Sequence, residues 1–115
     1  MEEPVLVFFY GTLKRGHYNY ERFKGGLCYL QSDAVDNYSL VEANPYYPHA
    51  VVDVGGVIYG EVFQVMDERT FYMIDNMELG AGYKQEKVTT VGGIECIMYL
   101  STNKAHEKLP KKSEF

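Results

Sequence analysis

The chain has 115 residues and a mass of 13.2 kDa, which is the size of one domain with one hydrophobic core. Hydrophobic residues make up 46% of the sequence and aromatic residues 15%, which excludes intrinsic disorder as a description of the whole chain. The formal net charge of -5 argues against a nucleic-acid partner, because no excess of positive charge can replace the counterions of the phosphates.

The two cysteines, Cys28 and Cys96, lie in apolar, strand-like runs. They permit at most one disulfide and are too few for a structural zinc site, so we expect reduced, buried thiols. His17 and His49 lack a third ligand at metal-like spacing, and we expect no metal. Neither a signal-peptide pattern nor a run of about 18 apolar residues is present, so we expect a cytoplasmic protein with no membrane partner.

The first half of the chain predicts several strands and one short helix. Residues 4–10 read PVLVFFY, a continuous apolar run that predicts a strand buried on both faces. Residues 17–23 favour a short helix. Short β segments are predicted at 27–30, 37–42 and 49–54, separated by glycines and turn residues. Short strands with frequent turns favour a barrel-like sheet.

The second half begins with the strongest strand signal after the first. Residues 57–66 are rich in β-branched and aromatic side chains, and Gly60 within them suggests a bend. Asp67 is a good N-cap for a helix that runs to about Glu78 and is stopped by Gly80. This helix is the clearest one in the sequence.

The last elements are a hairpin and a polar end. Residues 85–91 and 94–101 flank the pair Gly92-Gly93, which predicts a tight turn between two strands. Beyond Ser101 the sequence becomes polar and rich in lysine. We therefore predict one domain over residues 1–103 and a polar, partly disordered C-terminal tail over residues 104–115.

Glu78 is the first candidate for a chemical role. At 100° per residue, Phe71, Ile74 and Glu78 fall on one face of the predicted helix, so the carboxyl shares the apolar face. Burial would raise its pKa toward the range that suits a general acid or base. The alternative from periodicity alone is that the last turn frays near Gly80 and Glu78 turns to solvent.

The second candidate is the turn that follows the first strand, Tyr10-Gly11-Thr12-Leu13. A glycine there allows backbone N–H groups to turn toward an anion, and the nearby Lys14, Arg15 and Arg22 would favour a carboxylate. Taken alone, the turn is also explained as the ordinary end of a strand, which every β-containing fold has.

These segments, in this order, resemble the γ-glutamylcyclotransferase-like family, which includes γ-glutamylamine cyclotransferase and small AIG2-like proteins. The similar segments are VFFYGTLKRG at 7–16, YPHA at 47–50, VIYGEVFQV at 57–65, IDNME at 74–78 and the following Tyr83. The resemblance implies an α+β fold, a small mixed β-barrel with few helices.

The resemblance also implies a reaction and its residues. The family releases 5-oxoproline from a γ-glutamyl amine or γ-glutamyl amino acid, by attack of the substrate's own α-amine on its γ-carbonyl and without a cofactor. The family's catalytic glutamate corresponds to Glu78. Its substrate-binding residues correspond to Tyr10, Gly11, Thr12 and Leu13, and its downstream tyrosine to Tyr83.

Two other classes of function stay open at this point. One is a binding module that holds a small carboxylate-bearing metabolite without turnover, because a fold does not guarantee an activity. The other is an interaction protein that uses some of the 11 tyrosines at its surface. The sequence gives neither the leaving group nor the oligomeric state.

Overall fold

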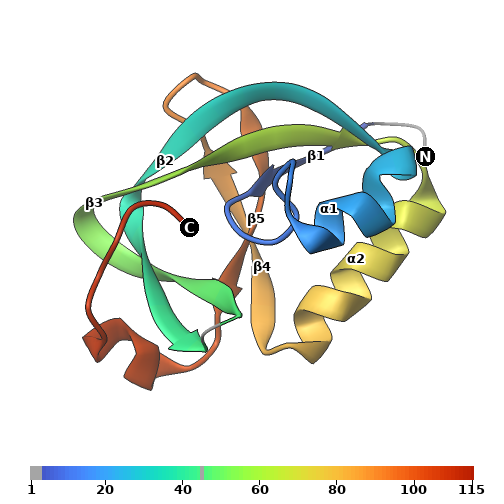
Figure 1. Cartoon of the computed structure of the whole chain (residues 1–115). Coiled ribbons are helices and arrows are strands. Elements are labelled where there is room, and N and C mark those ends of the chain that lie inside the picture. Colours follow the sequence, from blue (N-terminus) through green and yellow to red (C-terminus); the bar gives the residue numbers. More distant parts are fainter. Residues whose placement is uncertain (1–3, 45) are drawn as a thin grey trace.

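The computed structural model describes residues 4–44 and 46–115 and is built on one five-stranded sheet, with strand order β2-β3-β1-β5-β4 (Figure 1). The central strand, β1 (Val5–Phe9), pairs antiparallel with β3 (Tyr47–Val65) and parallel with β5 (Glu95–Ser101). The outer strands are β2 (Leu27–Asn44) and β4 (Tyr83–Thr89). With helices on the sheet, the fold is α+β, as predicted.

Strand β1 is buried on both faces, which confirms the prediction from its apolar run. Val7 and Phe9 point to one face of the sheet and Phe8 to the other, and all three are buried. A strand in this central position has no solvent-facing side, so its sequence does not alternate between apolar and polar residues. The loop that follows β1 is therefore anchored at the middle of the molecule.

Strands β2 and β3 form a long bent hairpin, and the prediction of several short strands in this region was wrong. At the predicted turn Asn37 has a φ of 71°, and the register shifts between Asp36 and Tyr38. Gly55, with a φ of 88°, donates its N–H to the side chain of Asn37 over 3.1 Å. These residues bend the two strands at a β-bulge and do not end them.

The sheet curls but is not closed, so the expected barrel is incomplete. Its two edge strands, β2 and β4, approach each other at the turn between β4 and β5, where Val91 N–H donates to the carbonyl of Ala34 over 2.8 Å. Next to it, Gly92 N–H donates to Asp33 Oδ1 over 2.9 Å. Turn contacts hold the edges together there in place of a strand ladder.

Helix α2 (Glu68–Gly80) begins as predicted and ends slightly later. The Asp67 side chain caps it by accepting from Thr70 N–H over 2.8 Å. The helix continues through Gly80, and the positive φ that follows it is at Gly82, with a value of 93°. None of the helices in the described residues is long and apolar enough to cross a membrane.

Helix α1 (Tyr18–Phe23) and the 3-10 turn η1 (Lys24–Gly26) connect β1 to β2. In Figure 1 both α helices lie at the same side of the sheet. Gly26 packs against the start of α2 so closely that a Cβ there would lie 2.0 Å from Thr70 Oγ1. This contact sets the position of α2 relative to the turn that follows α1.

Buried side chains form one cluster on each face of the sheet. The cluster beneath α2 contains Phe9, Phe63 and Ile74, with Phe71 and Met77 packed against it. The cluster on the other face lies inside the curl of the sheet and contains Phe8, Tyr10, Val35, Leu40, Ile58, Val62, Met98 and Leu100. Both clusters include residues of β1.

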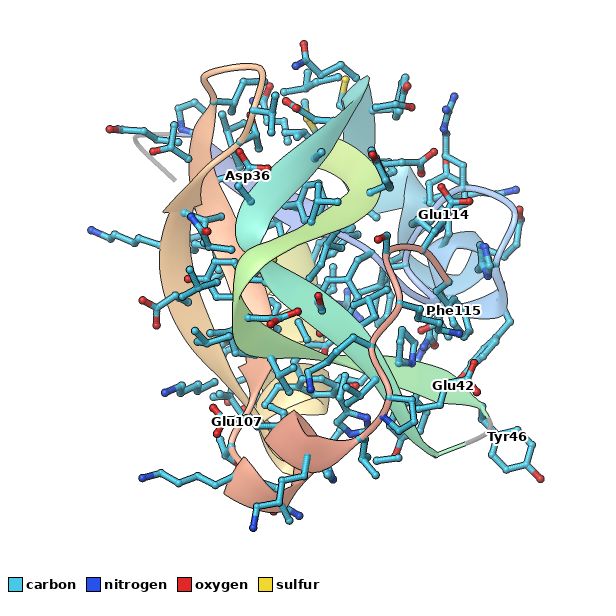
Figure 2. The ribbon with its side chains drawn as sticks, turned by 90° about the vertical axis from the view of Figure 1, so that its left-hand side faces the viewer. Asp36, Glu42, Tyr46, Glu107, Glu114 and Phe115 are labelled. Atoms are coloured by element: carbon cyan, nitrogen blue, oxygen red, sulfur yellow. The ribbon has the colours of Figure 1, made fainter. Side chains whose placement is uncertain are left out.

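The C-terminal segment, which the composition predicts as a tail, lies against the sheet. After η2 (Lys104–Lys108), Lys112 exchanges backbone hydrogen bonds of 2.8 Å with Leu40 of the edge strand β2. The Phe115 ring lies 5.4 Å from the His17 ring, beyond the loop after β1. Figure 2 shows Glu114 and Phe115 at the end of this segment, on the side of the molecule where that loop lies. Backbone pairing with an edge strand needs no apolar sequence, so composition alone does not detect it.

Candidate active site

A cavity of about 320 Å³ opens between the loop after β1, helix α1 and the C-terminal end of α2. The residues predicted from the sequence as a site all line it, and they come from three separate parts of the chain. These residues are Tyr10, Gly11, Thr12, Leu13, Glu78 and Tyr83. The cavity is also lined by Phe8, Tyr18, Asn19, Arg22, Tyr47, Pro48, Met77, Ala81 and Tyr99, most of which the sequence did not indicate.

The loop after β1, which lines this cavity, contains unpaired backbone donors. Within the described part of the chain, no acceptor pairs with the N–H groups of Gly11, Thr12 and Leu13. Gly11 has Pro48 beside it, and a Cβ at Gly11 would lie 3.1 Å from the proline ring. Three successive free N–H groups form a suitable place for an anion.

Helix α1 holds the loop from the other side. The Asn19 side chain, which is buried, donates to Thr12 Oγ1 over 2.7 Å, and Tyr20 N–H donates to the Thr12 carbonyl over 3.1 Å. These bonds occupy the acceptors of Thr12 and leave its N–H unpaired. The role of Asn19 was missed, because no sequence pattern indicates that it returns to a residue seven positions earlier.

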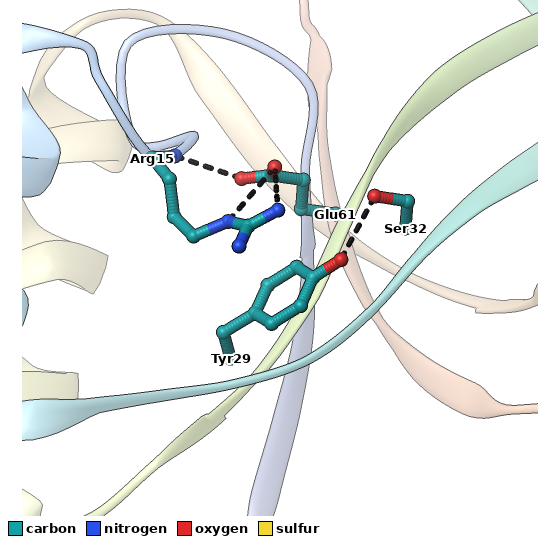
Figure 3. Close-up of polar contacts among 4 residues, drawn as sticks. All are labelled: Arg15, Tyr29, Ser32 and Glu61. Carbon is teal, nitrogen blue, oxygen red and sulfur yellow. Dashed lines mark hydrogen bonds and ion pairs between the residues drawn. The ribbon is translucent and has the colours of Figure 1, made fainter.

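Two of the three basic residues near the loop point away from the cavity. Arg15 forms hydrogen bonds of 2.7 to 3.2 Å with Glu61 through its backbone N–H and its guanidinium, which lies 3.4 Å from the centroid of the Tyr29 ring (Figure 3). Lys14 donates to the carbonyl of Phe115 over 2.9 Å. Arg22 is the basic residue that lines the cavity. The Arg15 contacts fix the far end of the loop.

Glu78 lies at the inner end of α2, with its side chain largely withdrawn from solvent. Burial, and secondarily the negative charge of Asp75, raise the pKa of Glu78 from 4.5 to about 7. In the described residues no hydrogen bond or ion pair engages its carboxyl. The helix does not fray before this position, so Glu78 shares the side of Ile74, which is fully buried.

Asp75, one turn before Glu78, is held by two side chains. Asp75 Oδ1 accepts from the Tyr99 hydroxyl over 2.8 Å and from Gln85 Nε2 over 2.5 Å. Tyr99 and Gln85 lie on β5 and β4, so the two strands fix the carboxylate that faces Glu78 along the helix. Asp75 therefore raises the pKa of Glu78 from a defined position.

The hydroxyl groups of Tyr10 and Tyr83, two tyrosines of the cavity wall, form hydrogen bonds within the protein. Tyr83 donates to the carbonyl of Pro48 over 2.6 Å, and Tyr10 donates to the carbonyl of Tyr99 over 2.6 Å. Burial raises the pKa of both phenols, which are therefore neutral. Tyr10 and Tyr83 thus line the cavity, and their hydroxyl groups bind backbone carbonyls of the neighbouring segments.

His49 lies behind the cavity wall and stacks on Tyr83, with ring centroids 5.0 Å apart. Burial, followed by the nearby His106, lowers the pKa of His49, which keeps the ring neutral. No group of three or more His, Cys, Asp or Glu side chains that could hold a metal ion occurs within residues 4–44 and 46–115. His49 thus supports the wall as a packed aromatic ring.

Comparison with known proteins identifies the family. The model of the family described as γ-glutamyl cyclotransferase, AIG2-like, matches residues 7–114. The chain belongs to this family. A Pyrococcus horikoshii protein provisionally named a γ-glutamylcyclotransferase is 35% identical over 92 residues, which cover 80% of this chain and 75% of that protein. A Vibrio cholerae protein with the same provisional name is 29% identical over 103 residues, covering 88% and 87% of the two chains.

Solved structures agree with this family assignment. An uncharacterized protein from Pyrococcus horikoshii superposes with a TM-score of 0.72 and 27% identity, over 96% of this chain and 83% of that one. An AIG2-like protein from Mus musculus superposes with a TM-score of 0.83 and 21% identity, over 98% and 88% of the two chains. The mouse protein shows that the fold is shared.

Proposed function

We propose that the protein is a γ-glutamylcyclotransferase that releases 5-oxoproline from a small γ-glutamyl substrate. Membership of the family supports the reaction class. The observation that carries the proposal for this chain is the Glu78 carboxyl, which lines the cavity, has a pKa of about 7 and is not engaged by another described side chain. A carboxyl with a pKa near neutrality suits both removal and return of a proton.

The reaction forms one bond and breaks one within the same molecule. The α-nitrogen of the γ-glutamyl group attacks the γ-carbonyl carbon and closes a five-membered lactam, and the bond from that carbon to the leaving nitrogen breaks. Ionised Glu78 takes a proton from the attacking nitrogen and returns it to the leaving nitrogen, which departs as an amine. No oxidant, reductant or second substrate enters this balance.

The cavity contributes by holding the substrate folded. A well-oriented intramolecular reaction can gain about 7 to 11 kcal/mol relative to reaction between separate molecules. The free N–H groups of Gly11, Thr12 and Leu13 would hold a carboxylate or stabilise the oxyanion that forms on the γ-carbonyl. The rings of Tyr10 and Tyr83 provide flat walls that restrict the substrate.

The test is product analysis with a panel of γ-glutamyl amines, γ-glutamyl amino acids and glutathione. We expect 5-oxoproline and a free amine in equal amounts. Substrates whose α-nitrogen carries an acetyl group are the matched control and should not react, because the nucleophile is blocked. Glutamate as the product would contradict the proposal by indicating hydrolysis. Binding of the panel without any product would favour a non-catalytic module for carboxylate-bearing metabolites.

A further inference from the structure

The charges of the cavity are distributed unevenly between its interior and its mouth. Among the described residues that line it, Glu78 and Arg22 are those that carry charge near neutral pH. Glu78 is largely withdrawn from solvent, whereas Arg22 lies exposed on α1. Tyr18, one helical turn before Arg22 and therefore on the same helix face, is 64% exposed and also lines the cavity. This face of α1 thus forms part of the mouth.

Unlike Arg15 and Lys24, Arg22 has no carboxylate partner in the described part of the chain. Lys24 pairs with Glu21 over 2.7 Å, and Arg15 pairs with Glu61 over 3.1 Å. The contact of Arg22 is instead with a ring, its guanidinium carbon being 5.0 Å from the centroid of Phe23. Such a contact leaves the donors of a guanidinium available to a ligand.

The reaction proposed above divides a substrate into two parts, and the cavity offers separate groups for each. The γ-glutamyl part must place its reacting nitrogen at Glu78. Its carboxylate or its γ-carbonyl then lies at the free backbone N–H groups of the loop after β1. The leaving group then extends toward the mouth, where α1 faces Met77 and Ala81 of the end of α2. Arg22 is the cation at that mouth.

We propose that Arg22 is a specificity-determining residue that selects leaving groups bearing a carboxylate. A guanidinium binds a carboxylate through two parallel hydrogen bonds, a geometry that a neutral amide does not reproduce. Since the leaving group of a γ-glutamyl amino acid or peptide ends in a carboxylate, such substrates are preferred to simple γ-glutamyl amines. This inference rests on the proposed function for its division of the substrate, while its binding step can be measured separately.

The experiment compares two ligands that differ in one group, γ-glutamylglycine and γ-glutamylglycinamide. In the first the leaving group ends in a carboxylate, and in the second it ends in a neutral amide of nearly the same shape. Release of 5-oxoproline is measured for the wild type and for Arg22→Met, which removes the charge and keeps an unbranched side chain. Arg69→Met is the matched control, because Arg69 is exposed and lies outside the residues that line the cavity. Binding of both ligands is measured by calorimetry in the Glu78→Gln background, with and without Arg22→Met.

We expect the wild type to favour γ-glutamylglycine by about tenfold in kcat/KM, mainly through KM, and Arg22→Met to remove this preference. Arg22→Lys should restore part of it, and Arg69→Met should leave it unchanged. An equal loss for both ligands in Arg22→Met would overturn the inference, since Arg22 would then hold the γ-glutamyl part. A preference that survives Arg22→Met would overturn it as well.

The two arms separate this inference from the proposed function. Absence of 5-oxoproline from both ligands and from the whole panel contradicts the proposed function, while an Arg22-dependent binding preference for γ-glutamylglycine in calorimetry still supports the role of Arg22. Absence of binding for both ligands in that arm contradicts the role of Arg22, because the cavity would not accept the ligand class.

Discussion

The buried carboxyl of Glu78 makes the stability of the protein depend on pH, and replacement by glutamine removes that dependence. Burial and the charge of Asp75 raise the pKa of Glu78 from 4.5 to about 7. In the unfolded chain the carboxyl is in water and ionises near the lower value. Between the two values the unfolded chain loses the proton while the folded protein keeps it, so the free energy of unfolding falls as pH rises.

The size of this effect follows from the two pKa values. Raising the pKa of Glu78 from 4.5 to about 7 corresponds to about 3 kcal/mol. Below the pKa of the unfolded chain both states hold the proton, and the free energy of unfolding is not reduced. Above the pKa of the folded protein the reduction is complete. In Glu78→Gln the side chain keeps its shape but does not ionise. The free energy of unfolding of the variant should therefore rise relative to that of the wild type by up to about 3 kcal/mol across this window.

The assay is urea unfolding of the wild type and of Glu78→Gln, followed by circular dichroism from about pH 4 to about pH 8. Glu95→Gln is the control, because Glu95 is exposed on β5 and its carboxyl is hydrated in both states. We expect the Glu78→Gln difference to grow with pH and then level off, and the Glu95→Gln difference to stay nearly flat. A Glu78→Gln difference that is the same at every pH would refute the reasoning.

Three other substitutions test the surroundings of the site. Asp75→Asn removes a negative charge that raises the pKa of Glu78, so the acidic limb of the pH profile of kcat/KM should move to lower pH. An unmoved limb would show that Asp75 does not raise the pKa of Glu78. Glu61→Gln weakens the anchor of Arg15, so KM should rise about threefold to tenfold with a smaller change in kcat, whereas an unchanged KM would show that the loop holds its shape without it. Gly26→Ala places a Cβ 2.0 Å from a threonine oxygen of α2, so thermal unfolding should show a free energy of unfolding lower by about 1 to 3 kcal/mol. An unchanged stability would show that the helix shifts to accommodate the Cβ.

Local sequence patterns were sufficient to predict the strand and the helix that position Glu78. The apolar run of β1 and the spacing of Phe71, Ile74 and Glu78 depend on neighbours within one or two turns of chain. The cap at Asp67 is equally local, and the structure confirms it. Since α2 continues to Gly80, the periodicity argument for an inward-facing Glu78 applies over its whole length. These features could be predicted because the residues that interact to form them lie close together in the sequence.

Features that depend on distant partners were not predictable. Lys14, Arg15 and Arg22 are equivalent in the sequence as sources of positive charge. In the structure Arg15 pairs with Glu61 on β3, and Lys14 donates a hydrogen bond to the carbonyl of Phe115. Arg22 is therefore the one of the three that lines the cavity. The choice among the three is made by tertiary contacts.

The long hairpin was misjudged for a related reason. Asn37 and glycine residues such as Gly55 are signals for a chain reversal when each is considered alone. In the structure they face each other across paired strands, where a hydrogen bond from Gly55 N–H to Asn37 Oδ1 stabilises a bulge. A turn and a bulge use the same residue types, and the pairing of two distant segments decides between them.

The central claim is that Glu78 transfers the proton during cyclisation, and the most direct measurement is the rate of 5-oxoproline release by Glu78→Gln beside the wild type. The account predicts a loss of about a hundredfold to ten-thousandfold in kcat, with γ-glutamylglycine still bound in calorimetry. The matched variant Glu95→Gln should keep the wild-type rate. A Glu78→Gln enzyme that releases 5-oxoproline at the wild-type rate would contradict the account.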